Sequence, residues 1–297
     1  MQALGRLLAH PAGEAPFRIG PYDFHPSAKL LIDGPFTNQG LAGLAGLDGV
    51  CDLDLFWHVT AITAAGFASL IQMPNLVSLG CDGKLSSNEA MRHIAAIPRL
   101  RRLRTQESLA TDDGFIALSQ SKTLESLWGR ECPNFGSRGF VALSQMPALR
   151  SLGIGCRNVA AAALATLPQF PSLREITPIG FQDWGFRHIG NCEKLERLSC
   201  MYCRDTTDVS TEHIAGLHLQ SYYAGLTQIT DRSLEILGRM TSLEVVELFE
   251  TKQVTDAGLA YLAGLPRLER IELSGLPNVT LAGTRVFPAR VQVNYDV

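Results

Sequence analysis

Two cysteines, Cys200 and Cys203, are separated by two residues, a spacing that zinc sites and redox-active dithiols use. A zinc site of this kind needs further ligands, yet the sequence has no second CxxC and no histidine closely follows Cys203. The chain has seven cysteines, an odd number that disfavours a disulfide-stapled secreted scaffold. We therefore expect the two thiols of the CxxC to be structural.

Carboxylates and histidines offer two further possibilities for chemistry. Asp52, Asp54 and Asp82 suit a hard cation, which takes carboxylate ligands, although a solvated acidic patch is the simpler interpretation. His188 and His213 hold the same position in consecutive segments without a thiol or carboxylate partner, so we expect both to be exposed. No P-loop, dinucleotide fingerprint or Ser/His/Asp order is present. We expect no catalytic residue, no cofactor and no metal, and a protein that is not an enzyme.

The elements that must position these residues follow from an internal repeat. Its cleanest copy begins at Leu243 and reads LEVVEL, a five-residue loop, VTDAGL, and then Leu262, Leu265 and Leu268. The fourth residue of each copy is aliphatic or aromatic: Leu53, Leu79, Leu103, Leu127, Leu152, Ile176, Leu198, Tyr222, Val246 and Ile271. With a shorter copy before Leu53, the pattern predicts about eleven units.

Each part of the repeat predicts one element. Alternating leucines in LxxLxL point to one face of a strand, and leucines that step by three suit a short helix facing the same core. Thr255 and Asp256 are good residues for the start of that helix, and Pro266 ends it. Gly258 is less expected in a first helical turn, and we interpret it as permitting close packing between neighbouring units. One unit cannot bury its apolar face alone, so the units must stack.

The pattern resembles the leucine-rich repeat family over roughly residues 28 to 293. The VTDxGL segments are similar to those of the cysteine-containing and related bacterial subclasses. The resemblance implies an α/β fold: a right-handed, horseshoe-shaped solenoid with a concave parallel β-sheet and helices or 3₁₀ segments on its convex side. It also implies that the ninth residue of a unit hydrogen-bonds loop backbone. Here that position holds Ser108, Cys132, Cys203, Thr227 and Thr251.

The ends of the chain differ from the repeats. We expect residues 1–27 to form an N-terminal cap, with Phe17, Ile19, Tyr22 and Phe24 covering the first unit. Residues 28–283 form the solenoid and residues 284–297 a C-terminal cap, in one continuous domain. No apolar stretch approaches the length of a membrane span, and the N-terminal apolar run is too short for a secretory signal. A cytoplasmic protein without membrane contact is the expectation.

The concave surface is the expected binding face, because the third, fifth and seventh residues of each unit point away from the core. It begins with an acidic zone, Asp52, Asp54 and Asp82, and two glycines, Gly153 and Gly155, leave a gap in its middle. Tryptophan, tyrosine and arginine are the residue types most enriched at binding hot spots. The candidate binding residues are therefore basic and aromatic near the middle and apolar further on: Arg102, Arg104, Trp128, Arg130, Met201, Tyr223 and Phe249.

These features favour a non-enzymatic recognition module that binds a protein or peptide on the concave face. The formal net charge is −3 and only 19% of residues are charged, which disfavours a nucleic-acid partner. Two alternatives remain at this stage. One is a specificity subunit or effector-type adaptor for a partner enzyme, and the other is a small-ligand or enzymatic site in the central gap.

Overall fold

The computed structural model describes residues 6–9, 17–19, 22–24, 29–45, 47–56 and 58–296, the first three segments as backbone only. Our predictions for the side chains of Phe17, Ile19, Tyr22 and Phe24 lie outside the described residues. The chain divides into two compact units. The first unit is Met1–Leu149 with Asn158–Ala160, and the second is Arg150–Arg157 with Ala161–Val297.

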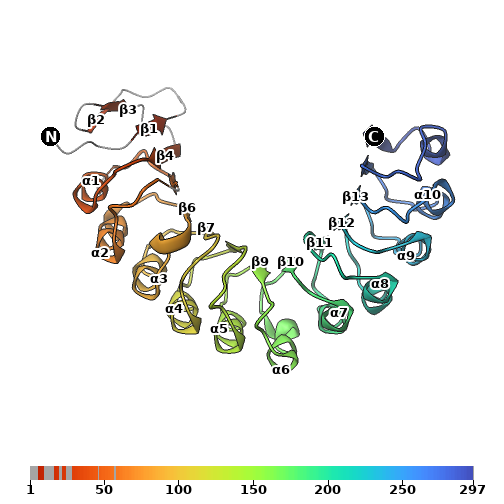
Figure 1. The fold of residues 1–297 in the computed structure, drawn as a ribbon, viewed down its shortest axis with the longest axis horizontal. Helices are drawn as coiled ribbons and strands as arrows, with labels where there is room; N and C mark the ends of the chain where they lie inside the picture. The colour runs from red at the N-terminus through yellow and green to blue at the C-terminus, as the bar shows by residue number, and fades with distance from the viewer. Residues whose placement is uncertain are drawn as a thin grey trace. The chain divides into compact units, whose positions relative to one another are not determined.

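The first unit is built from five consecutive parallel strands with a helical segment after each (Figure 1). The strands are β4 (Lys29–Asp33), β5 (Asp52–Leu55), β6 (Ser78–Cys81), β7 (Arg102–Arg104) and β8 (Ser126–Gly129). The helical segments are α1 (Asn38–Ala42), α2 (Ala64–Phe67), η1 (Ala68–Gln72), η2 (Gly83–Leu85), α3 (Asn88–Ala95), α4 (Asp112–Leu118) and α5 (Ser137–Leu143). Before them, β1 (Arg6–Ala9) pairs antiparallel with β4, and β2 (Phe17–Ile19) pairs with β3 (Tyr22–Phe24).

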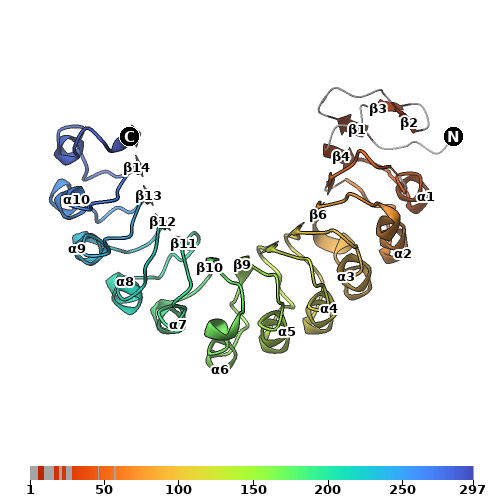
Figure 2. The ribbon, with the colours of Figure 1, turned by 180° about the vertical axis from the view of Figure 1, so that it is seen from behind.

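The second unit repeats the same plan over seven parallel strands (Figure 2). The strands are β9 (Ser151–Gly155), β10 (Glu175–Ile179), β11 (Arg197–Cys200), β12 (Ser221–Gly225), β13 (Val245–Phe249), β14 (Arg270–Ser274) and β15 (Gln292–Asp296). The helical segments are α6 (Ala161–Leu164), η3 (Leu167–Gln169), α7 (Asp183–Ile189), α8 (Asp208–Ile214), α9 (Asp231–Leu237), α10 (Asp256–Ala263) and η4 (Gly283–Val286). The segment expected to close the stack thus contains a further parallel strand, β15.

The strands are aligned by the residues that the repeat predicts. In the first unit Leu53 lies beside Leu79, and Leu103 beside Leu127; in the second, Val246 lies beside Ile271. All six are fully or almost fully buried. Within each unit the helices cover one face of the sheet and the core lies between them, so the other face carries no helix (Figures 1 and 2). We call this other surface the helix-free face.

The VTDxGL motif is explained by contacts between consecutive units. Thr255 is the N-cap of α10, and its hydroxyl accepts a hydrogen bond from the Ala257 amide. The same threonine donates from its amide and from its hydroxyl to the Asp231 carboxylate at the start of α9, at 2.8 and 2.6 Å. Thr230 and Asp208 repeat this pair of contacts one unit earlier. Each aspartate therefore fixes the start of the next helix, a role beyond the capping that the sequence predicts.

Tyr222 occupies a core position that other units fill with an aliphatic residue, and it is almost fully buried. Its hydroxyl hydrogen-bonds the side chains of Thr211 and Cys200. Thr211 in turn shares a hydrogen bond with Ser233 at 2.9 Å, and Ser233 donates to the Asp208 carboxylate at 2.6 Å. The buried phenol is thus satisfied by a chain of hydroxyl groups that leads to the start of a helix, as a buried polar group requires.

The ninth residues of the units divide into two groups. Ser108, Cys132 and Cys203 donate to backbone carbonyls, as the resemblance implied; Ser108 Oγ to Ser86 O is 2.8 Å and Cys203 Sγ to Pro178 O is 3.0 Å. For Thr227 and Thr251 the expected hydrogen bond to loop backbone is wrong, because in the described structure their buried hydroxyl oxygens have no hydrogen-bond partner.

Candidate functional site

On the helix-free face of the first unit, Arg104 is held by two carboxylates. Its Nη1 atom lies 2.6 Å from Asp82 Oδ2, and its Nη2 atom lies 2.8 Å from Asp54 Oδ1. The second Asp54 oxygen faces Lys29 Nζ at 3.4 Å. Burial alone would lower the pKa of Arg104, but the two carboxylates outweigh it and raise that pKa above its ordinary value. The expected acidic and basic zones therefore neutralise one another at this point.

Gly80 makes this arrangement possible. It lies on β6 between Asp54 on β5 and Arg104 on β7 in the strand register. A Cβ atom at residue 80 would collide with Asp54 Oδ1 and would lie 2.6 Å from Arg104 Nη2. The missing side chain lets the guanidinium lie across the strand. The place between Asp54 and Asp82, where the sequence suggested a cation, is filled by this guanidinium.

The other basic and aromatic residues of the first unit lie beside Arg104. Trp128 pairs with Arg104 in the register of β7 and β8 and is half-buried. Arg102 is exposed at the start of β7, and Arg130 is half-buried with its Nε atom 4.0 Å from Glu131. Because the Arg104 side chain reaches toward Asp54, it points away from Trp128. The structure thus leaves Arg102, Trp128 and Arg130 as the remaining candidates of the first unit and assigns Arg104 to an internal contact.

A cleft of about 360 Å³ opens in the first unit where strands β5 and β6 end. Its apolar lining comes from Phe56, Val59, Ile62 and Leu85, and the almost fully buried Asp82 forms part of its wall. Asp82 also accepts a hydrogen bond from the Gln106 amide at 2.9 Å. The carboxylate is consequently bound on both oxygens by the protein itself.

In the second unit, the predicted residue Met201 directly follows β11, Tyr223 lies in the middle of β12, and Phe249 is the last residue of β13. Phe249 is 36% exposed, and Met201 and Tyr223 are half-buried. Tyr223 lies along its own strand over Gly225, with its hydroxyl 2.5 Å from where a Cβ atom on residue 225 would be. Burial raises the pKa of Tyr223, and the negative charge of Glu247 adds to the rise.

Two residues of this surface escaped the sequence analysis. Tyr202 and Glu250 occupy the eighth position of their units and adopt left-handed backbone conformations, with φ of 61° and 48°. Tyr202 is 36% exposed, and both residues contribute to the raised pKa of Tyr223. Other units have a glycine at the eighth position: Gly83, Gly180 and Gly275. Because glycine favours the left-handed conformation, these glycines were the sequence signal that this position is left-handed.

The central glycines do not form a site that the structure describes. In the second unit Gly153 is buried and Gly155 half-buried on β9, where they pair with Thr177 and Ile179 of β10. Thr177 and Ile179 are themselves 6% and 8% exposed, although their positions face away from the helices. This part of the face offers little side-chain surface to a ligand.

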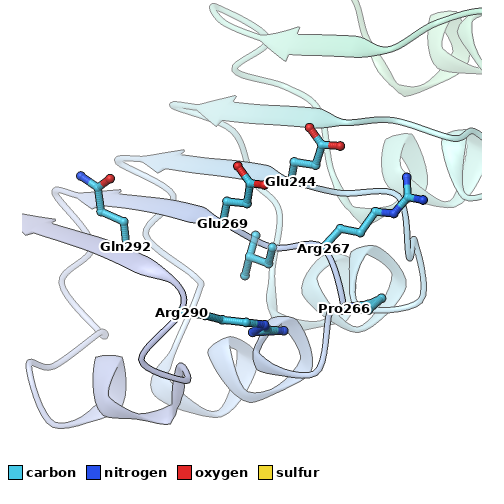
Figure 3. Close-up of a pocket in the computed structure, with 7 residues that line it drawn as sticks. Glu244, Pro266, Arg267, Glu269, Arg290 and Gln292 are labelled. Atoms are coloured by element: carbon cyan, nitrogen blue, oxygen red, sulfur yellow. The ribbon is translucent and has the colours of Figure 1, made fainter.

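A more open cleft of about 770 Å³ lies at the opposite ends of the strands in the second unit (Figure 3). Glu244 and Glu269 precede β13 and β14, and Arg267 and Arg290 come from the segments that follow helices. Arg290 donates to the Leu265 carbonyl at 2.7 Å. The cleft is lined by charges of both signs, and none of the seven predicted binding residues lines it.

The cysteines and histidines are structural or peripheral. Cys200 and Cys203 are both buried, and burial raises the pKa of Cys203 to about 12, far from the value that a reactive thiol needs. His213 is exposed as expected, whereas His188 is half-buried and accepts a hydrogen bond from Arg187 Nε at 3.3 Å. Within the described part of the chain, no three histidine, cysteine or acidic residues converge in a way that could hold a metal ion.

Solved structures with a similar fold exist. "Crystal structure of Rad7 and Elc1 complex in yeast" matches with a TM-score of 0.63 and 20% sequence identity over 88% of this chain and 72% of that one. The matched chain carries leucine-rich repeats. This chain has the leucine-rich repeat fold. An internalin (inlF) from Listeria monocytogenes str. 4b F2365 matches with a TM-score of 0.40 and 14% identity, over 83% and 87% of the two chains.

No protein-family model and no curated protein sequence matches this leucine-rich repeat chain. The likeness to the Rad7 and Elc1 structure establishes the fold, α/β with stacked parallel strands, and the ligand has to be argued from the surface. Among the described residues, no helix has the length and hydropathy that crossing a membrane would require.

Proposed function

We propose that this protein is a non-enzymatic recognition module that binds a protein or peptide on the helix-free face. The observation that carries the proposal is the group Met201, Tyr223 and Phe249, whose side chains stand on the face opposite to the core. Large side chains of this kind are typical of binding hot spots. Met201 and Tyr223 are already half-buried against neighbouring residues before any partner binds. An aromatic surface that is held in place before binding loses little entropy when a partner arrives.

Arg102, Trp128 and Arg130 on the helix-free face of the first unit are a second proposed group of binding residues. Arg104 is removed from it, since its guanidinium is already bound by Asp54 and Asp82. We propose that the protein binds its partner in the cytoplasm, because seven unpaired thiols suit a reducing compartment. The Rad7 and Elc1 structure is a complex of two proteins, but at 20% identity it supports the fold and not a shared partner.

Selection from a library of random peptides of about twelve residues tests the proposal, because peptides of this length span several strands. The purified protein is immobilised, enriched peptides are synthesised, and their affinities are measured by fluorescence anisotropy. We expect the double variant Tyr223→Ala with Phe249→Ala, or the single variant Trp128→Ala, to weaken binding at least tenfold, the size of a hot-spot effect.

A matched control is available on the helical side. Tyr261 on α10 is 48% exposed, so Tyr261→Ala removes a comparable aromatic ring from the opposite face. Its affinity for the selected peptides should equal that of the wild type. Enriched peptides whose affinity is insensitive to all the variants of the helix-free face would refute the proposed function.

A further inference from the structure

Charge is distributed unevenly over the helix-free face of the second unit. From β11 to β15, all four charged residues at the fifth, seventh and eighth positions of the repeat are carboxylates: Glu247, Glu250, Glu272 and Asp296. The basic residues of these strands, Arg197 and Arg270, occupy the third position, where the strands begin. The half of the face that carries Tyr223 and Phe249 is therefore acidic.

Part of this negative charge is already compensated. Arg270 lies 3.3 Å from Glu247 and 3.7 Å from Glu272, and Lys252 and Arg204 are exposed in the loops beyond the strands. Glu250 forms no ion pair with any described residue. Of the carboxylates near the aromatic rings, Glu250 is thus the one whose charge is left for a ligand.

The Glu250 side chain is held in a defined place. Its backbone is left-handed with φ of 48°, and its Cγ atom lies 2.9 Å from where a Cβ atom on Gly275 would be. The Glu250 side chain therefore passes close to the glycine of the next unit. Tyr223 is positioned in the same way by Gly225. Gly225 and Gly275, which have no side chains, thus leave room for the Tyr223 ring and for the Glu250 side chain.

Aromatic rings and a carboxylate together recognise a particular chemistry. The face of a tyrosine or phenylalanine ring attracts a cation, and a carboxylate beside it supplies the opposite charge and a hydrogen-bond acceptor. An anionic partner would meet repulsion from Glu250 and Glu247, and a purely apolar one would leave these charges desolvated. The combination fits the side chain of lysine or arginine.

We propose that Tyr223, Phe249 and Glu250 form a site for a lysine or arginine side chain on an extended basic segment of a partner protein. The inference rests on the proposed function and specifies its partner. Tyr202, which is exposed shortly after β11, adds a third aromatic ring to this part of the face. Neighbouring strands are about 4.8 Å apart, so further basic residues of the segment can reach the carboxylates of β14 and β15.

The test uses a fluorescein-labelled peptide of alternating lysine and glycine, about twelve residues long, and an otherwise identical peptide with glutamate in place of lysine. Anisotropy titrations at about 50 and about 300 mM NaCl measure the affinity and its screening by salt. The lysine peptide should bind the wild type more weakly at high salt, and the glutamate peptide should not bind.

The variants separate the ring from general negative charge. Tyr223→Ala and Phe249→Ala should each weaken binding of the lysine peptide about tenfold, and Glu250→Gln about fivefold. Tyr223→Phe keeps the ring and should retain wild-type affinity, which guards against a loss caused by misfolding. Tyr261→Ala and Glu193→Gln remove an exposed ring and an exposed carboxylate elsewhere and should change nothing.

Equal binding of the lysine and glutamate peptides, or lysine-peptide binding that survives Tyr223→Ala and Phe249→Ala, would overturn the inference. Its failure is distinguishable from that of the proposed function. Library peptides that require Tyr223 and Phe249 for binding but carry no excess of lysine or arginine would refute the inference and support the proposed function. If no selected peptide depends on the helix-free face, both fail.

Discussion

The carboxylate of Asp231 fills the space that a side chain on residue 258 would need. Asp231 receives two hydrogen bonds from Thr255, and a Cβ atom on Gly258 would collide with its Oδ1 atom. The same conflict exists between Asp256 and residue 283. At these two contacts the glycine leaves room for the aspartate of the preceding unit. At the equivalent position after Asp208 the chain has Ser233, whose hydroxyl donates to the carboxylate instead.

The first prediction concerns this conflict. Gly258→Ala should destabilise the protein by about 1–3 kcal/mol, because the added methyl must displace a carboxylate that is hydrogen-bonded in place. Thermal or urea unfolding followed by circular dichroism measures the loss. Gly264→Ala is the matched control, since a Cβ atom there would meet nothing within 4 Å; its stability should equal or slightly exceed that of the wild type.

A double variant extends this test. Asp231→Ala with Gly258→Ala should cost less than the sum of the single changes, since the carboxylate that obstructs the new methyl is gone. Strict additivity of the two losses would show that the contact between Asp231 and residue 258 is not the cause.

The second prediction concerns Arg104. Removing its guanidinium leaves two nearby carboxylates without a cation, one of them the Asp82 side chain at 5% exposure. Arg104→Ala should therefore cost about 2–3 kcal/mol, somewhat less than for a fully buried pair because Arg104 is partly solvated. Denaturant unfolding gives this value. Arg102→Ala removes an exposed arginine two residues earlier and should change stability by less than about 0.5 kcal/mol.

The same contact affects how binding is tested. Reversing the charge at Arg104 would place three carboxylates together and disturb the fold, so a lost interaction could not be attributed to a binding surface. If Arg104→Ala unfolds like the wild type, the guanidinium is not held as the structure shows, and Arg104 returns to the candidate binding residues.

The fold was predictable because its signals are local and repeated. The leucine positions that pair across strands, the threonine caps and the close-packed Gly258 could all be inferred from the repeat. The direction of the Arg104 side chain could not, since it depends on Gly80 being its neighbour across strands and not along the chain. Sequence columns show which residues share a face but not which of them bind each other.

The candidate site was predictable to the same limited extent. Tyr223 and Phe249 were found because their positions alternate with the core residues of a strand. Tyr202 and Glu250 were missed because they follow the strands, where the alternation ends and a left-handed backbone conformation sets the direction of the side chain. Tyrosine and glutamate give no sign of that conformation, and only glycines at the equivalent position of other units indicate it.

The third prediction uses the unsatisfied threonines. Thr251 is fully buried and its hydroxyl has no described partner, so Thr251→Val should stabilise the protein by about 1 kcal/mol through the removal of a desolvated polar group. Thr206→Val is the control, because Thr206 is equally buried but donates to the Cys203 carbonyl at 2.7 Å. The control should lose stability in the same calorimetric measurement. A loss of similar size in both variants would indicate that the Thr251 hydroxyl has an acceptor.

The fourth prediction concerns acid stability. Burial would raise the pKa of Asp208, but hydrogen bonds from Ser233 and Thr230 outweigh it and lower that pKa below its ordinary value. A carboxylate with a lowered pKa in the folded state contributes stability above about pH 4, and this contribution is lost as the pH falls through the folded value. The stability difference between wild type and Asp208→Asn should therefore shrink below about pH 4.

Asp205→Asn serves as the comparison, because Asp205 is exposed in the preceding loop. Its unfolding free energy should follow that of the wild type at every pH. A constant difference between wild type and Asp208→Asn across the acid range would contradict the assignment of a lowered pKa to Asp208.

The last prediction concerns the thiols. Six of the seven cysteines are buried and only Cys51 is partly accessible. Burial raises the pKa of Cys132, Cys192 and Cys203 to about 12, so few of these thiols are ionised at about pH 8. Burial also keeps a thiol reagent in the solvent from reaching them. An aromatic disulfide reagent should titrate about one thiol in the native protein and all seven after denaturation. Cys51→Ser should abolish the native reaction. Fast labelling of Cys203 in the folded protein would mean that the CxxC pair is accessible, and would reopen the redox and metal chemistry that its spacing suggested.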